Sequence, residues 1–344
     1  MTFKKALSLA KHEIKCGNLK QIADIFDSRK DILVSIHCLV YNQEKYLRRC
    51  FDGFLKQKTN FNVEIIVHDD HSTDNSSLII KEYSEKYPDI FKTIFQKENI
   101  YSQTGNFLGI EKFTTKQSRG LYVAICEGDD YWTDEYKLFL QVKLMEQFKD
   151  SHFCIHKVLV REENRDNDSY LPITRLKSGL IPSKKIIRIS NNLYEFQTSS
   201  YFFRLADYRD FIFNLPEFAK MFPTDDEALI HYFGSLGEVL YLNRTMSCYN
   251  KFTINSWSSS HLSSKKEEKK QKYIRYVNAI RAYDSFFDYN FHKECLNVFL
   301  NFELKELLES NNYEAIRSNG TLRRFTLRKS FKLYLRILFG KKKS

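Results

Sequence analysis

The sequence predicts an α/β fold in which a mostly parallel sheet is covered by helices on both faces. Strand-like and helix-like segments alternate along residues 31–148. The strand-like segments are nearly continuous apolar runs, which is typical of strands buried on both faces. Acidic residues follow two of these runs directly. Because ligands of such sheets bind beyond the carboxyl ends of the strands, these acids indicate where a site lies.

The expected elements of the first half follow from apolar periodicity. The strands are DILVSIHCLVY (31–41), VEIIVHDD (63–70), IFKTIFQ (90–96) and GLYVAICE (120–127). Helical spacing predicts helices over residues 42–57, 72–87, 103–118 and 134–148. Ser72 or Thr73 can cap the second helix, and Pro88 follows its end.

The second half is less regular. Residues 152–160 predict a strand, whereas residues 162–196 are polar and are expected to form an irregular insertion. An amphipathic helix is expected from Asp226 to about residue 236, and residues 264–318 are expected to be helical.

Composition limits the class of protein. The 344 residues, 42% of them hydrophobic, allow one large domain or a core domain with an attachment. No apolar run reaches the roughly 20 residues that span a bilayer. The cysteines number seven and never show CxxC spacing, so we expect a reducing, cytoplasmic location rather than a disulfide framework or a zinc site.

The net charge of +11 is concentrated at one end of the chain. Residues 321–344 hold nine Lys and Arg and no acidic residue, so the net charge of residues 1–320 is only about +2. Apolar residues recur there at helical spacing, so this basic tail is expected to contact the inner, anionic face of a membrane peripherally. Docking on its own domain is the alternative. A nearly neutral body argues against nucleic-acid binding.

Phosphate-binding loops are absent from the sequence. Neither GxGxxG nor GxxxxGK[ST] occurs, which argues against a dinucleotide dehydrogenase or a P-loop protein. An acidic cleft cannot hold a diphosphate unless a divalent cation lies between the carboxylates and the phosphate oxygens.

Three motifs occur in order along the first half. They are YNQEKYLRRCFDGFLKQ (41–57), EIIVHDDHSTDNS (64–76) and YVAICEGDDYWTD (122–134). Together they resemble the N-terminal half of family 2 glycosyltransferases, which have the Rossmann-like GT-A fold. The similarity continues at TSSYFFR (198–204) and PTDDEALIHYFGSLGEVLYL (223–242), and covers about residues 31–260.

The resemblance implies a division of the chain. It comprises a helical lead-in (1–30), a GT-A domain (31–262), a C-terminal helical extension (263–320) and the basic tail (321–344). Within the GT-A domain, residues 31–150 would be the nucleotide-binding half and residues 151–262 the acceptor half.

The resemblance also implies donor-binding residues. Tyr41 and Asn42 would line the base pocket, and Asp70 would accept a hydrogen bond from the base, such as uracil N3–H. The alternative for Asp70 is that it caps the following helix. Lys251 stands near the position where many relatives have Arg-x-His, and would contact the diphosphate as a point charge.

Glu127-Gly128-Asp129 matches the family's Asp-x-Asp, with Glu127 in place of the first acid. The resemblance implies that Glu127 contacts the ribose and that Asp129 coordinates Mn²⁺ or Mg²⁺. Asp130 belongs to the same metal cluster, where it either supports Asp129 or begins the next turn. The alternative is a charged turn that holds no ion.

Asp226 matches the family's catalytic base, which takes a proton from the acceptor hydroxyl during inverting transfer. Asp225 precedes it and is a plausible helix cap, so the two roles are interchangeable at this stage.

The sequence therefore predicts a metal-dependent, inverting glycosyltransferase of the hexosyl or N-acetylhexosaminyl class. It would move a sugar from a UDP-sugar to a glycan or lipid-linked acceptor in surface polysaccharide synthesis. One alternative is a sugar nucleotidyltransferase, but that class needs a Gly-rich basic loop that is absent here. The other is a non-catalytic basic protein that binds anionic lipid or nucleic acid, which would spread its charge over the body.

Overall fold

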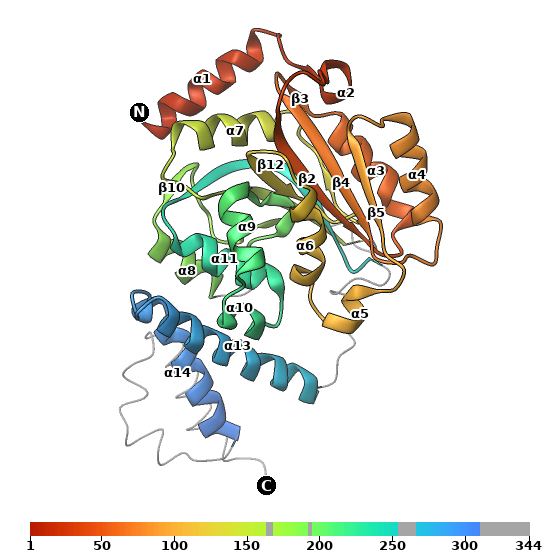
Figure 1. Cartoon of the computed structure of the whole chain (residues 1–344). Helices are drawn as coiled ribbons and strands as arrows, with labels where there is room; N and C mark the ends of the chain where they lie inside the picture. Colours follow the sequence, from red (N-terminus) through yellow and green to blue (C-terminus); the bar gives the residue numbers. More distant parts are fainter. Residues whose placement is uncertain (163–167, 192–194, 254–265, 310–344) are drawn as a thin grey trace.

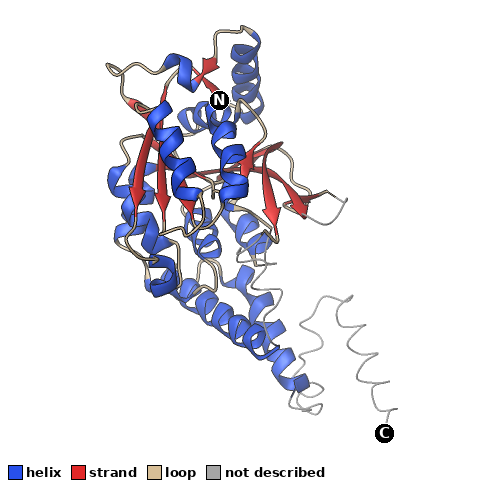
Figure 2. Ribbon diagram, turned by 90° about the vertical axis from the view of Figure 1, so that its right-hand side faces the viewer, coloured by secondary structure: helices blue, strands red, loops and turns tan. Residues whose placement is uncertain are grey.

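The structure is a computed structural model that describes residues 1–162, 168–191, 195–253 and 266–309. One large sheet lies at the centre with helices on both sides (Figures 1 and 2). Its strand order is β10-β12-β8-β11-β6-β2-β4-β5, with β7 pairing to β12 and β9 to β8. This mixed α/β architecture confirms the predicted fold class.

The first half of the sheet is parallel. Its strands are β2 (Ile32–Val40), β4 (Asn62–Asp69), β5 (Phe91–Phe95) and β6 (Tyr122–Ile125). The connecting helices are α3 (Glu44–Leu55), α4 (Ser76–Lys86), α5 (Ile100–Thr104) and α6 (Leu108–Gln117). Each predicted strand is therefore present, and the acids that follow β4 and β6 lie at one edge of the sheet.

The second half mixes strand directions. The short β11 (Phe202–Arg204) runs antiparallel between β6 and β8 (Phe153–Glu162). β12 (Val239–Lys251) then pairs in parallel with β8. The short strands β7 (Tyr131–Trp132), β9 (Ser169–Leu171) and β10 (Gly179–Ile181) complete the sheet.

Two apolar clusters cover the opposite faces of the sheet. Alternation along β6 separates them, because Tyr122 and Ala124 face one cluster while Val123 and Ile125 face the other. Helices α3, α4 and α7 (Lys137–Gln147) contribute to the first cluster. The second takes residues from α8 (Ser183–Ser190), α9 (Leu205–Phe213), α10 (Glu217–Met221) and α11 (Asp225–Ser235).

Two expectations about local structure were wrong. The helix expected over 103–118 is interrupted at Gly105, which has a φ of +69° and ends α5. The segment 162–196, expected to be irregular, contains β9, β10 and α8. α8 buries Ile186, Ile187 and Ile189 and exposes basic residues between and before them, but it has only 8 residues, too few for a periodicity to be evident in the sequence.

Helices near both ends of the described residues pack against the body. α1 (Phe3–Lys15) lies along α7, and the small β1 (Lys20–Gln21) pairs with β3 (Lys58–Thr59) before α2 (Ile22–Ile25). The C-terminal helical extension is confirmed as α13 (Lys266–Phe286) and α14 (His292–Glu309). α13 lies against α10 (Figure 1), and the basic tail lies outside the described residues.

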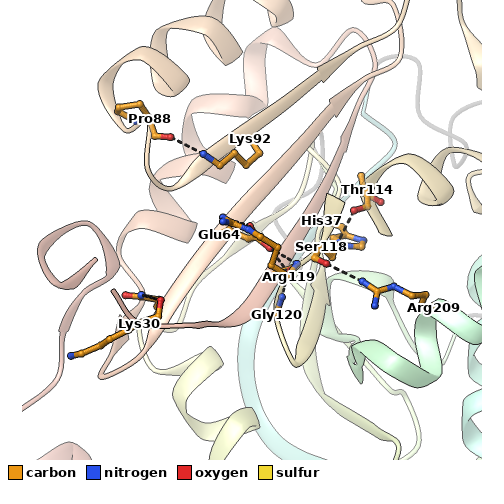
Figure 3. Close-up of polar contacts among 12 residues, drawn as sticks. Lys30, His37, Glu64, Pro88, Lys92, Thr114, Ser118, Arg119, Gly120 and Arg209 are labelled. Carbon is orange, nitrogen blue, oxygen red and sulfur yellow. Dashed lines mark hydrogen bonds and ion pairs between the residues drawn. The ribbon is translucent and has the colours of Figure 1, made fainter. Parts of the chain in front are cut away.

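A buried polar network fixes the amino-terminal ends of the central strands (Figure 3). Glu64 of β4 is fully buried and accepts hydrogen bonds from the Ser35 hydroxyl at 2.7 Å and the Arg119 backbone N–H at 2.7 Å. Gly120 donates to Ser35, and a Cβ on Gly120 would lie 2.7 Å from the Ser35 nitrogen. The network therefore ties β2, β4 and the start of β6 together below the site.

Within the described ranges, no helix combines the length and the hydrophobicity that a membrane span requires.

Candidate active site

A pocket of about 540 Å³ opens at the carboxyl ends of β2, β4 and β6. Tyr41, Asp70 and Glu127, which follow these three strands, all line it. Pro223–Asp226, at the start of α11, line it from the second half of the chain. The structure thus brings the three strand ends and the segment with the expected base to one cavity.

Asp70 is buried, and its carboxylate caps α5. Its Oδ1 accepts from the Ile100 N–H at 2.8 Å and its Oδ2 from the Tyr101 N–H at 2.9 Å. Asp70 therefore caps a helix, though not the next helix along the chain, which was the alternative considered from sequence. Each carboxylate oxygen has a second lone pair, so Asp70 can still accept from a ligand in the pocket.

Asn42 lies beside the pocket rather than in its lining. Its Oδ1 accepts hydrogen bonds from the backbone N–H groups of Thr73 at 2.7 Å and Asp74 at 3.4 Å. Its backbone has a φ of +52°, which asparagine tolerates better than most residues. Asn42 thus shapes the loop between β4 and α4, and through it the edge of the pocket.

The turn after β6 presents Glu127 and Asp129 to the pocket. Gly128 between them packs closely, because a Cβ there would lie 2.5 Å from Gln43 Oε1 and 2.8 Å from Leu47 Cδ2. Asp129 is 7% exposed, and its Oδ2 accepts from the Thr253 hydroxyl at 2.8 Å. The other carboxylate oxygen of Asp129 is therefore available to a ligand.

Two other residues expected in the site do not line the pocket. Asp130 is 1% exposed, and its Oδ1 accepts from the Asn250 N–H at 2.9 Å. This contact fixes the turn against the end of β12. Lys251, the last residue of β12, lies 3.5 Å from Glu162 through its Nζ. Neither side chain belongs to the pocket lining.

Asp225 and Asp226 both line the pocket but have different surroundings. The Asp225 carboxylate accepts from the backbone N–H of Phe107, and from that of Leu108 at 3.3 Å, so it caps α6. The Asp226 carboxylate accepts from the N–H of Glu227 at 3.1 Å, within its own helix. Asp225 therefore caps α6 rather than its own helix α11, whose N-cap is Thr224, and Asp226 is left facing the cavity.

The pocket is strongly acidic. Five carboxylates line it, and no Lys, Arg or His of the described residues does so. Burial raises the pKa of Glu127 to about 8, and the charges of Asp129 and Asp226 add to this effect. Burial also raises the pKa of Asp225 to about 7 and shifts that of Asp129 upward. The lining can hold a cation but repels a bare phosphate.

The raised pKa of Glu127 predicts that the unfolding free energy of the protein depends on pH. The pKa of Glu127 is about 8 in the folded protein and about 4.3 in the unfolded chain. The folded protein therefore binds the proton more tightly. The stability that the protonated group contributes is fully present below about pH 4.3 and is lost as the pH rises through about 8. We expect Glu127→Gln to raise the unfolding free energy of the metal-free protein by about 2 kcal/mol at pH 8, and by far less at pH 5. Urea unfolding in EDTA at both pH values measures this. A variant less stable than the wild type at pH 8 would contradict it.

Several lining residues had no sequence motif to mark them. Tyr101 lines the pocket together with Asp225 and Glu127, and burial and the charges of these two acids raise its pKa. Asn99 before α5 and Gly105 after it are helix-cap residue types and could have indicated this short helix. Nothing local indicates Gln197 or Phe196, which reach the pocket only through the fold.

A parallel half-sheet, a mixed second half and an acidic pocket between them define the GT-A class of fold. The family model for glycosyltransferase family 2 matches residues 35–210. The chain therefore belongs to glycosyltransferase family 2.

Relatives and solved structures agree with this membership. An uncharacterized protein of Mycobacterium tuberculosis is 36% identical over 234 residues, which is 68% of this chain and 63% of that one. The chain thus matches less than two thirds of that relative's length. Glycosyltransferase GlyG of Streptococcus pneumoniae is 28% identical over 64% of this chain and 71% of its own. TarS residues 1–349 of S. aureus, solved with UDP-GlcNAc, superimposes with a TM-score of 0.56 at 17% identity, covering 87% of this chain and 77% of that one.

Proposed function

We propose that the protein is an inverting glycosyltransferase that uses a nucleotide sugar and a divalent metal ion. The observation that supports this most strongly is the pocket at the strand ends, lined by five carboxylates and, among the described residues, by no basic side chain. Such a lining suits a neutral sugar and a metal-neutralised diphosphate. The UDP-GlcNAc bound to the structurally similar TarS favours a UDP-sugar as donor.

The donor would lie along the strand ends. Asp70 accepts a hydrogen bond from the base, Tyr41 lines the base site, and Glu127 accepts from the ribose hydroxyls. Asn42 shapes the adjoining loop. Lys251 would reach the diphosphate only after leaving Glu162, which its Nζ approaches to 3.5 Å.

The chain's own residues fit a divalent ion. Asp129 has one carboxylate oxygen not engaged by Thr253, and the substrate's phosphates and water can fill most of the shell of Mn²⁺ or Mg²⁺. Asp130 would support Asp129 by fixing the turn. When bound, the ion neutralises charge on the departing diphosphate. Among the described residues, no group of three His, Cys, Asp or Glu side chains is placed to hold a metal ion without other ligands.

Asp226 would be the general base. Its carboxylate removes the proton from the acceptor hydroxyl while that oxygen attacks the anomeric carbon and the bond to the diphosphate breaks. A single displacement of this kind inverts the anomeric configuration. Burial raises the pKa of Asp226, so the rate is expected to increase with pH as this group ionises.

Release of nucleoside diphosphate from a panel of UDP-, GDP- and dTDP-sugars, with Mn²⁺ and with EDTA, tests the proposal. We expect metal-dependent release from at least one UDP-sugar. Formation of a nucleotide sugar from a nucleoside triphosphate and a sugar phosphate would instead favour the nucleotidyltransferase alternative. No turnover with any donor would contradict a transferase.

The acceptor belongs to the same proposal. We infer a glycan or lipid-linked acceptor in surface polysaccharide synthesis, because a relative is a minor teichoic acid biosynthesis protein of Bacillus subtilis, 30% identical over 92 residues. This match covers 26% of the chain and therefore supports the general process alone.

The basic tail makes a separate prediction about location. Its nine Lys and Arg and its apolar stripe favour contact with an anionic bilayer. We expect deletion of residues 321–344 to reduce sedimentation with phosphatidylglycerol vesicles at least tenfold, and to leave the weak binding to phosphatidylcholine vesicles as it was. Equal sedimentation of the two proteins with anionic vesicles would contradict membrane contact through the tail.

A further inference from the structure

Gln197 presents an amide group to the pocket. It is 8% exposed and lines the cavity next to Phe196 and Thr198. Its Oε1 accepts two hydrogen bonds, one from the Ser199 backbone N–H at 2.8 Å and one from the Thr198 hydroxyl at 2.8 Å. Since a backbone N–H can only donate, the oxygen must lie on that side of the amide and Nε2 on the other. Within the described part of the chain, Nε2 has no hydrogen-bond partner.

The segment that holds Gln197 forms a hydrogen-bonded turn that leads into β11. The Gln197 carbonyl accepts from the N–H of Ser200 at 3.0 Å and from its hydroxyl at 2.7 Å, which closes the turn η1 (Thr198–Ser200). Tyr201 follows directly, and its hydroxyl lies 3.4 Å from the backbone oxygen of Asp226. The Tyr201 carbonyl accepts from the Ile125 N–H, so Gln197 lines the pocket where β11 enters the sheet beside the carboxyl end of β6. The Tyr201 side chain links this segment to Asp226.

We propose that Gln197 is an acceptor-binding residue whose Nε2 donates a hydrogen bond to a hydroxyl of an uncharged sugar, and that this sugar receives the transferred residue. The inference rests on the proposed function and specifies its acceptor. An amide donor fixed in the same pocket as the base is suited to hold one hydroxyl of the acceptor while another hydroxyl reaches the base.

The charge of the pocket determines the acceptor class. Asp225 and Asp226 line the same pocket, and no basic side chain of the described residues lines the cavity. A phosphate or uronate group on the acceptor would be repelled there, and a neutral amide cannot compensate its charge. Sugar hydroxyls accept from Nε2 and donate to carboxylates, so an uncharged sugar satisfies both kinds of partner. Phe107 and Phe196 add apolar surface for its C–H face.

The test uses the full chain, Mn²⁺ and the donor that gives the fastest nucleoside diphosphate release. The neutral acceptors are p-nitrophenyl β-glucoside and p-nitrophenyl β-galactoside. The anionic acceptors are p-nitrophenyl β-glucuronide, which matches the glucoside except for its carboxylate, and glucose 6-phosphate. Transfer product and free sugar from donor hydrolysis are measured together. We expect transfer to a neutral glycoside to exceed transfer to either anionic acceptor at least tenfold.

Two variants test Gln197 itself. Gln197→Glu keeps an oxygen for Ser199 and Thr198 but removes the donor, and Gln197→Leu removes both functions. We expect each to lower the ratio of transfer to hydrolysis at least tenfold and to raise the acceptor KM. Gln147→Glu, the same exchange at an exposed position at the end of α7, is the matched control and should leave the ratio unchanged.

Three results would overturn the inference: preferred transfer to the glucuronide or phosphate, transfer to neither neutral glycoside by an enzyme that hydrolyses the donor, or an unchanged ratio in Gln197→Glu. Failure of the proposed function is a different result, because the wild type would then release no nucleoside diphosphate from any donor.

Discussion

Replacing Asp226 by asparagine is expected to lower kcat for sugar transfer by about 10³-fold. Asparagine has nearly the same shape and can still accept the hydrogen bond from the Glu227 N–H, but it cannot take a proton from the acceptor. The increase in rate with pH that reflects ionisation of Asp226 should disappear in the variant. Steady-state transfer assays across pH 5–9 with saturating donor measure both effects.

Asp225→Asn is the matched control, because the two aspartates are adjacent and both line the pocket. The asparagine oxygen can still accept from the N–H groups of Phe107 and Leu108, so α6 keeps its cap. We expect a loss of less than about tenfold for this variant. If Asp225→Asn were the more damaging change, the base would have to be reassigned to Asp225.

Asp129→Asn is expected to lower metal-dependent turnover by about 10²-fold and to raise the Mn²⁺ concentration for half-maximal rate by at least tenfold. The amide keeps an oxygen for the Thr253 hydroxyl but loses the negative charge that attracts the cation. Mn²⁺ titration of nucleoside diphosphate release measures this. Full metal-dependent activity in Asp129→Asn would remove the basis for the site.

Asp130→Asn distinguishes direct from indirect support of the metal. Asp130 is buried, and its Oδ1 accepts a hydrogen bond from the Asn250 N–H. The side-chain oxygen of an asparagine at position 130 can accept the same hydrogen bond. We expect a clearly smaller change in the Mn²⁺ requirement than for Asp129→Asn. An equal or larger change would place Asp130 in direct contact with the ion.

The sequence predicted those parts of the fold that depend on local patterns of apolar residues. The predicted strands that end at Tyr41, Asp70 and Glu127 are nearly continuous apolar runs, which are typical of strands buried on both faces of a sheet. The rule that ligands bind at strand carboxyl ends then placed these three residues together, and one pocket does include all three.

Features that depend on distant contacts could not be predicted. The choice between Asp225 and Asp226 depends on Phe107, which lies 118 positions from Asp225 in the chain. Asp70 caps α5, thirty positions further along, rather than the next helix. Gln197 enters the pocket because β11 inserts between β6 and β8, and no motif of the sequence encodes that pairing.

The central claim is that a pocket rich in carboxylates and without a basic side chain among the described residues binds a nucleoside diphosphate through a divalent ion. Calorimetric titration of UDP into the protein, in Mn²⁺ and then in EDTA, tests it most directly. The expected result is binding in Mn²⁺ that weakens at least a hundredfold in EDTA. Equal affinity for UDP in EDTA would contradict the claim.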